Sequence, residues 1–134
     1  RVKDLTEEPV KVLVIDYDDQ TELLKVEAWL RETMAEEVDC FFSCDQYLEV
    51  VPKGMNKGEA VKMLCSMMNV AIEDAVAVGD AANDLSMIDA AGIGVAMANG
   101  TEEVKRIADY ITHRDNNHGG VQEVVERFFG EYAQ

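Results

Sequence analysis

The sequence predicts an α/β fold in which a small parallel sheet with crossover helices follows a short α+β unit. Beyond about residue 56, short apolar runs alternate with segments whose apolar residues recur every three or four positions. This alternation is typical of parallel strands joined by helices. Before residue 53 the order differs, because one helical segment is followed by two adjacent strand-like runs. The 134 residues, 48% of them hydrophobic, suffice for about one domain-sized core.

The N-terminal part, residues 1–52, has the order of a βαββ unit. Its helix is indicated by Leu23, Val26 and Leu30, which recur at helical spacings. The last two strands are close enough in sequence to form a hairpin, and Pro52 ends the second one. The strands are predicted at residues 10–15, 38–43 and 47–51, and the helix at residues 21–34.

The C-terminal part, residues 53–134, alternates helices with strands. Asn56 is predicted to cap its first helix, and Asn99 or Thr101 a later one. The three predicted strands make a small sheet, so neither part looks complete by itself. The helices are predicted at residues 58–68, 85–91, 102–108 and 121–129, and the strands at residues 75–78, 93–97 and 110–112.

The composition excludes several functional classes. A formal net charge of −15 argues against non-specific binding to nucleic acid or to anionic membranes. The three cysteines are odd in number and form no C-x-x-C pair, so a disulfide framework is not expected. No apolar run approaches the roughly 20 residues that span a bilayer, and the charged N-terminus lacks a signal-like core. We therefore expect a cytoplasmic protein.

Three oxygen-bearing side chains follow the strand predicted at residues 75–78. Asp80, Asn83 and Asp84 lie where this strand ends and a helix begins, and open α/β sheets bind ligands at the carboxyl ends of their strands. Oxygen ligands suit Mg²⁺, for which Asp80 is the expected direct ligand and Asp84 a ligand through water. Asn83 is a candidate for binding phosphate or for orienting Asp80. A polar loop with helix-capping acids explains the spacing equally well.

A phosphate site also needs a fixed positive charge. Lys53 and Lys57 both precede the helix that leads into the strand at residues 75–78, and Lys57, at the start of that helix, is the better candidate. A solvated surface lysine is the alternative explanation for either residue.

A second acidic motif follows the first predicted strand. Asp16, Asp18 and Thr21 resemble the D-x-D-x-T signature of aspartyl phosphatases, in which the first aspartate is the nucleophile and the second the general acid and base. The motif departs from that signature, because Asp19 replaces the usual glycine and the threonine comes one residue late. Helix capping by Asp18 or Asp19 is the favoured interpretation.

Three stretches of the sequence together resemble the haloacid dehalogenase superfamily, and most closely its Cof-type sugar-phosphate phosphatases. They are Lys57 in its N-K-G context, the run G-D-A-A-N-D at residues 79–84, and the run G-I-G-V-A-M-A-N-G at residues 92–100. The matching region extends from about residue 47 to residue 109 and resumes at Gly120-Val121, well over half of the chain.

The resemblance implies a Mg²⁺-dependent phosphatase of small phosphorylated metabolites that acts through an aspartyl-phosphate. It makes Lys57 the catalytic, phosphate-contacting lysine, Asn83 a phosphate-binding residue, and Asp80 and Asp84 the metal-binding residues. It also implies that residues 1–52 are part of an αβ cap domain and residues 53–134 the C-terminal part of a Rossmann-like core. The family's nucleophile precedes the cap, so we expect the isolated chain to lack it and to have little or no activity.

Two other readings stay open at this point. A cation-pumping ATPase carries a similar pair of motifs in its phosphorylation domain. A non-catalytic binding or assembly module would keep the fold without the catalytic half, and its acidic surface and uncovered sheet edge would suit self-association or a complementing N-terminal half.

Overall fold

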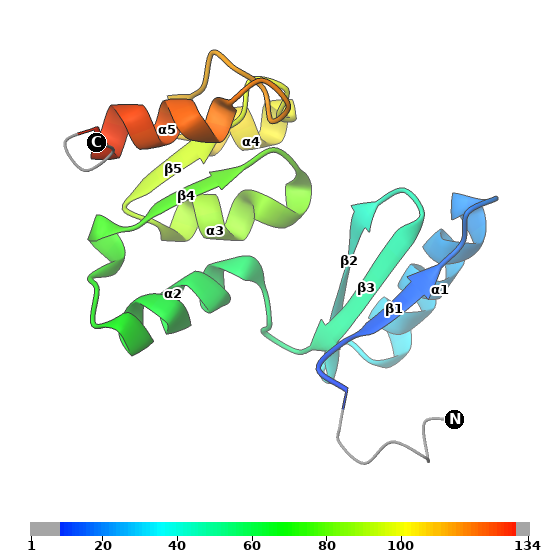
Figure 1. The fold of residues 1–134 in the computed structure, drawn as a ribbon. Helices are drawn as coiled ribbons and strands as arrows, with labels where there is room; N and C mark the ends of the chain where they lie inside the picture. Colours follow the sequence, from blue (N-terminus) through cyan, green and yellow to red (C-terminus); the bar gives the residue numbers. More distant parts are fainter. Residues whose placement is uncertain (1–8, 131–134) are drawn as a thin grey trace. The chain divides into compact units, whose positions relative to one another are not determined.

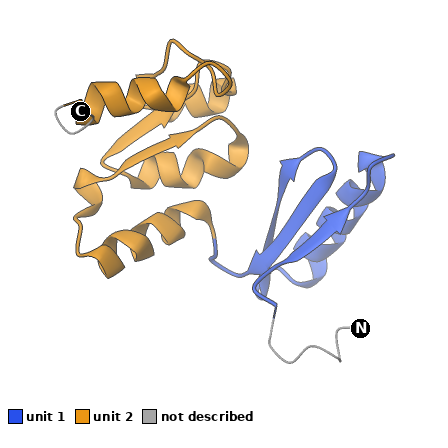
Figure 2. Ribbon diagram, in the orientation of Figure 1, with its two compact units in different colours: residues 1–55 blue, residues 56–134 orange. Residues whose placement is uncertain are grey.

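The structure is a computed structural model that describes residues 9–130 (Figure 1). Residues 1–8 and 131–134, which the predicted domains include, lie outside the described residues. The chain divides into two compact units, Arg1–Met55 and Asn56–Gln134 (Figure 2). The first contains an antiparallel sheet and the second a parallel sheet, so the predicted α/β fold class is confirmed.

The N-terminal unit is a three-stranded antiparallel sheet with one helix on it. Its strands lie in the order β1-β3-β2, with β3 between the other two. Leu23 and Leu30 of the helix pack against Cys40 and Leu48 of the sheet, and these four side chains form the buried core. The elements are β1 (Val12–Ile15), α1 (Gln20–Thr33), β2 (Val38–Cys44) and β3 (Tyr47–Pro52).

The acidic motif between β1 and α1 forms a turn and a helix cap. The carboxylate of Asp16 accepts hydrogen bonds from the backbone N–H groups of Asp18 and Asp19, at 2.9 and 3.1 Å. Asp19 is the N-cap of α1, and its carboxylate accepts from the N–H of Thr21 at 2.8 Å. The capping interpretation is therefore confirmed for Asp19.

The C-terminal unit alternates helices and strands as predicted. Its sheet is parallel with the order β4-β5-β6, and Val78 and Gly79 of β4 pair with Val95 and Ala96 of β5. Sequence reasoning missed two short 3-10 helices, at Ile72–Asp74 and Ala82–Asp84. The remaining elements are α2 (Lys57–Met68), β4 (Val76–Gly79), α3 (Leu85–Ala90), β5 (Ile93–Ala96), α4 (Glu102–Ile107), β6 (Tyr110–Ile111) and α5 (Gly120–Phe129).

The core of this unit lies between the sheet and its helices. Ile88 of α3 and Val104 of α4 are buried against Ala96 of β5, and Figure 1 shows α5 on the sheet face opposite to α3. Helix α2 packs on α3 rather than on the sheet. In the first half of the unit, α2 thus packs on α3 and α3 packs on the strands. Helix α3 therefore determines the position of the start of α2 relative to the end of β4.

Several surfaces of this unit, both outer strands of its sheet among them, are uncovered within the described residues. Strand β4 is an edge strand, since it pairs only with β5. The face of α2 that does not meet α3 exposes a stripe of apolar side chains, which we call the α2 stripe. Its members are between 55% and 78% exposed: Met63, Leu64, Met67 and Met68.

None of the helices within residues 9–130 combines the length and the apolar character that crossing a bilayer requires.

Candidate active site

The turn that follows β4 is built around the carboxylate of Asp84. This side chain is 5% exposed and folds back along the chain, so that its Oδ2 accepts from the N–H groups of Asp80 and Ala81 at 2.9 and 3.2 Å. Gly79 makes this possible, because a Cβ at that position would lie 2.4 Å from the Cβ of Asp84. The G-D-A-A-N-D run therefore encodes a tight turn at the carboxyl end of the strand.

Lys57 reaches the same carboxylate from α2. Its Nζ forms an ion pair with Oδ1 of Asp84, the oxygen that the backbone leaves free. The start of α2 is held close to α3, since the N–H of Gly58 donates to Oγ of Ser86 at 3.1 Å and a Cβ on Gly58 would lie 2.4 Å from the Ser86 carbonyl oxygen. The glycine after Lys57 thus brings the lysine to Asp84.

The Asp84 carboxylate is held in its charged form. Burial raises the pKa of Asp84, but the hydrogen bonds from Lys57 and from the two N–H groups outweigh it, so the pKa stands below its usual value. The lysine side chain is 44% exposed, so it is accessible from solvent while it pairs with Asp84. An exposed cation at this edge is suited to bind an anion.

Asp80 lies beside this pair and differs from it electrostatically. Its backbone is fixed from two sides, by its N–H on Asp84 at 2.9 Å and by its carbonyl oxygen, which accepts from the N–H of Thr101 at 2.9 Å. Its carboxylate accepts a hydrogen bond from Nδ2 of Asn99 at 3.3 Å. No lysine or arginine of residues 9–130 forms an ion pair with it, so its negative charge is available to a cation.

The sequence predicted Asn99 or Thr101 as the cap of α4, and the structure confirms Thr101. Thr101 caps α4, while the Asn99 side chain joins Asp80 to the backbone of Asn116. The signal that finds Asn99 is topological: β5 lies next to β4 and runs parallel to it, so residues shortly after both strands meet at one edge.

Asn83 belongs to the 3-10 helix of the same turn and is partly buried. Within residues 9–130 its side chain makes no hydrogen bond, so both ends of the amide can bind a ligand. Its predicted role in binding phosphate stays a prediction.

The donor set at this edge fits Mg²⁺ but does not form a complete cage. Mg²⁺ is usually held by one or two carboxylates together with water and substrate phosphate. Asp80 offers such a carboxylate, whereas both oxygens of Asp84 already accept hydrogen bonds. Residues 9–130 contain no cluster of three histidine, cysteine or acidic side chains. The assignment of Asp80 and Asp84 as metal-binding residues stays a prediction.

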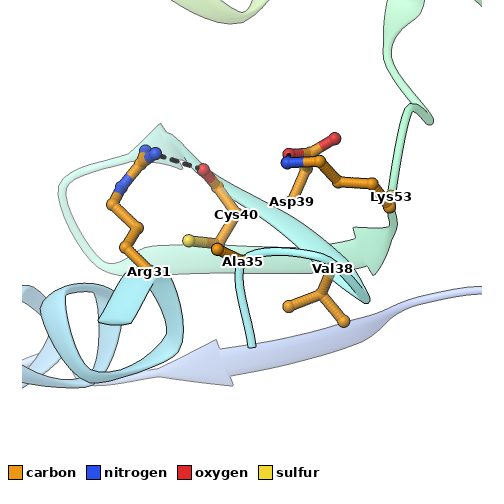
Figure 3. Close-up of a pocket in the computed structure, with 6 residues that line it drawn as sticks. All are labelled: Arg31, Ala35, Val38, Asp39, Cys40 and Lys53. Atoms are coloured by element: carbon orange, nitrogen blue, oxygen red, sulfur yellow. Dashed lines mark hydrogen bonds and ion pairs between the residues drawn. The ribbon is translucent and has the colours of Figure 1, made fainter. Parts of the chain in front are cut away.

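The alternative lysine has another partner. Lys53 forms an ion pair with Asp39 at 2.9 Å inside the N-terminal unit, where both line a pocket of about 130 Å³ (Figure 3). The pocket's other cation, Arg31, pairs with Glu27 and donates to the Cys40 carbonyl oxygen. Lys53 thus pairs with Asp39, whereas Lys57 pairs with Asp84 of the turn after β4.

Comparison with known proteins gives a family match. The model of the haloacid dehalogenase-like hydrolases matches residues 2–125. The chain is 42% identical over 96 residues to Phosphatase YwpJ of Bacillus subtilis. The matched region is 71% of this chain and 34% of that protein. It is 46% identical over 70 residues to a phosphoglycolate phosphatase of Methanosarcina mazei. This match covers 52% of this chain and 31% of that protein.

A solved structure shows the same fold. The crystal structure of a haloacid dehalogenase-like hydrolase from Bacteroides thetaiotaomicron matches with a TM-score of 0.81 and 39% identity. The match covers 96% of this chain and 47% of that one. The chain thus spans less than half the length of each of these relatives.

Proposed function

Because the chain belongs to the haloacid dehalogenase-like hydrolases, we propose that it forms part of a Mg²⁺-dependent phosphatase of small phosphorylated metabolites, with sugar phosphates as the substrate class. In this proposal an aspartate from outside the chain attacks phosphorus, the bond to the substrate oxygen breaks, and water then hydrolyses the aspartyl-phosphate. Bound Mg²⁺ supplies charge neutralisation at the phosphoryl oxygens. The cytoplasm is the compartment where we expect it to act.

The arrangement of Lys57, Asp80 and Asp84 supports this proposal most strongly. Lys57, held by the buried carboxylate of Asp84, lies at the carboxyl end of a parallel strand together with Asp80. Asp80 has no ion pair with a lysine or arginine of the described residues, and its carboxylate accepts from Asn99. The lysine is suited to bind a phosphoryl oxygen, and Asp80 is suited to bind the cation that neutralises the others.

The remaining residues then have defined roles. Asp84 holds Lys57 and the turn in place. It contacts the metal through water, with a carboxylate lone pair that its hydrogen bonds do not use. Asn83 donates its amide to the phosphate. These roles agree with the chemistry of each side chain and with its contacts.

The uncovered surfaces support a complementing N-terminal half as the partner. Parallel sheets are normally covered on both faces, and an unpaired edge strand invites another strand. Strand β4 has such an edge, and the α2 stripe, on the helix that packs against α3, is exposed and apolar. A strand beside β4 with a helix on the α2 stripe would cover both and would reach the site. We therefore expect little or no turnover from the isolated chain.

A metal titration tests this function. We expect Mg²⁺ with inorganic phosphate to bind the chain in a calorimetric titration, and Asp80→Asn to abolish the binding. Asp89→Asn, which removes an exposed acid from α3, is the matched control and should bind as the wild type does.

Two results would count against the proposal. Binding that is equal in wild type and Asp80→Asn would leave Asp80 without a role. Robust Mg²⁺-dependent turnover that disappears in Asp16→Asn would make the N-terminal acidic turn the nucleophile site instead.

A non-catalytic assembly module is the second candidate function, and the uncovered edge of β4 is the observation that favours it. Such a module would associate with itself or with a partner through this edge and would bind no Mg²⁺ at Asp80. The same titration, read together with the sedimentation behaviour of the chain, separates the two candidates. The phosphatase names of two relatives favour the phosphatase over a cation-pumping ATPase.

A further inference from the structure

Asn99 is the one side chain of residues 9–130 that donates a hydrogen bond to the carboxylate of Asp80. The main chain of Asp80 is already fixed by Asp84 and Thr101, but those bonds leave the side-chain torsions free to rotate. The Asp80 side chain itself accepts a hydrogen bond from Nδ2 of Asn99, 3.3 Å from its Oδ2.

The orientation of the Asn99 amide is itself determined. Its Oδ1 accepts from the N–H of Asn116 at 3.1 Å, and an N–H group can bond only to the oxygen end of an amide. The nitrogen end must therefore face Asp80. Asn99 thus works as a bridge whose two ends are not interchangeable.

The two loops that Asn99 connects are also joined by Thr112. Thr112, which is 3% exposed, accepts from the N–H of Ala98 at 3.0 Å and donates to the carbonyl oxygen of Arg114 at 2.6 Å. These bonds tie the loop after β5 to the loop after β6, so Asn99 is held between two fixed backbones rather than on a free segment.

The choice of an amide has a physical consequence. Asp84 is paired with a lysine, which offsets its charge, whereas Asp80 receives a hydrogen bond from a neutral group. A neutral donor restrains one oxygen without cancelling the charge, and the other oxygen stays available to a cation. Groups that hydrogen-bond to ligating carboxylates commonly tune metal affinity in this way.

We propose that Asn99 is a positioning residue that orients the Asp80 carboxylate for a divalent cation and links it to the loop that follows β6. The cation part rests on the proposed function, and the orientation of Asp80 does not.

The test uses the full 134-residue chain and two readouts in solution NMR. In the metal-free chain, the coupling constants of the Asp80 β-protons report whether the side chain keeps one χ1 rotamer. During titration with Mg²⁺, the amide signals of Gly79 and Ala81 report affinity. Asn99→Ala is compared with Asn117→Ala, which truncates a neighbouring asparagine whose side chain makes no bond to Asp80.

We expect one dominant Asp80 rotamer in the wild type and in Asn117→Ala, and averaged rotamers in Asn99→Ala. We expect the Mg²⁺ dissociation constant to rise about tenfold in Asn99→Ala and to change less than about twofold in Asn117→Ala. The amide of Asn116 should exchange faster in Asn99→Ala, because it loses its acceptor. Asn99 is exposed, so unchanged amide signals of Val95 and Val104 serve to check that the variant is folded.

A single Asp80 rotamer that persists in Asn99→Ala overturns the proposal, whatever the metal does. An unchanged dissociation constant in that variant, with normal binding by the wild type, also overturns it. If the wild type binds no Mg²⁺ while the rotamer depends on Asn99, the metal site of the proposed function fails and the orienting role of Asn99 stands.

Discussion

The carboxylates of Asp80 and Asp84 are four residues apart in sequence, yet their surroundings give them opposite properties. Asp84 is buried, paired with Lys57 and bonded to two backbone N–H groups, so it serves as a structural anchor. Asp80 is less buried, and the one hydrogen bond to its side-chain carboxylate from a side chain of residues 9–130 comes from the amide of Asn99. One short turn can therefore hold a lysine through Asp84 and still present the carboxylate of Asp80 to a cation.

The anchor role of Asp84 predicts a stability effect at Lys57. Replacing Lys57 by Met leaves the Asp84 carboxylate buried with its backbone donors alone, which should lower the free energy of unfolding by about 1–2 kcal/mol. Urea unfolding measures the change. Lys62→Met, which breaks an exposed pair with Glu59, is the control and should change stability by less than about 0.5 kcal/mol. Equal effects of the two variants would mean that the pair with Asp84 has no special weight.

At the scale of elements, Glu123 holds the start of the loop between β6 and α5 by several hydrogen bonds. Its carboxylate accepts from the Tyr110 hydroxyl at 2.6 Å and from the N–H groups of His113 and Arg114 at 2.9 and 3.0 Å. The same loop contains Asn116, whose N–H holds Asn99. Glu123, on α5, therefore fixes the loop whose residue Asn116 contacts Asn99 of the candidate site.

These bonds predict a pH dependence. The Tyr110 hydroxyl, followed by the N–H and ring of His113, lowers the pKa of Glu123 from 4.5 to about 2. Because the folded-state pKa is the lower one, the stabilisation is complete above about pH 4.5 and is lost as the pH falls towards 2. Between about pH 6 and about pH 3, the midpoint of thermal unfolding should fall less in Glu123→Gln than in the wild type, because glutamine does not titrate.

Glu126→Gln is the control for this measurement, because that carboxylate lies 3.9 Å from Arg114 and does not bind the loop backbone. It should follow the wild-type pH profile. A Glu123→Gln profile parallel to that of the wild type would show that Glu123 does not titrate in the expected range.

At the scale of the whole molecule, the chain consists of two units with separate cores. Leu48 lies at the centre of one, against Leu23 and Leu30, and Val104 lies in the other, against Ile88. Among residues 9–130, each of these two buried clusters belongs to one unit. The stability of each should therefore depend on its own core.

Leu48→Ala tests this independence. Leu48 is fully buried, and removing its side chain should cost about 2–5 kcal/mol. We expect hydrogen exchange to accelerate at the amides of β2 and β3, while the amides of β4 and β5 keep their protection. The reciprocal variant Ile88→Ala should show the reverse pattern. Acceleration in both units by either variant would mean that they unfold together.

The sequence by itself determined the type and order of the helices and strands. The spacing of apolar residues is a local pattern, and it differs between a helix and a strand that each bury one face. It also placed Lys57, Asp80 and Asp84 at one site, where glycines at 58 and 79 leave room for close approach. Only the tertiary structure decided how these groups are connected. The partner of each carboxylate comes from another element, Lys57 from α2 and Asn99 from the loop after β5, and such contacts depend on strand order and helix stacking, which local sequence patterns do not encode.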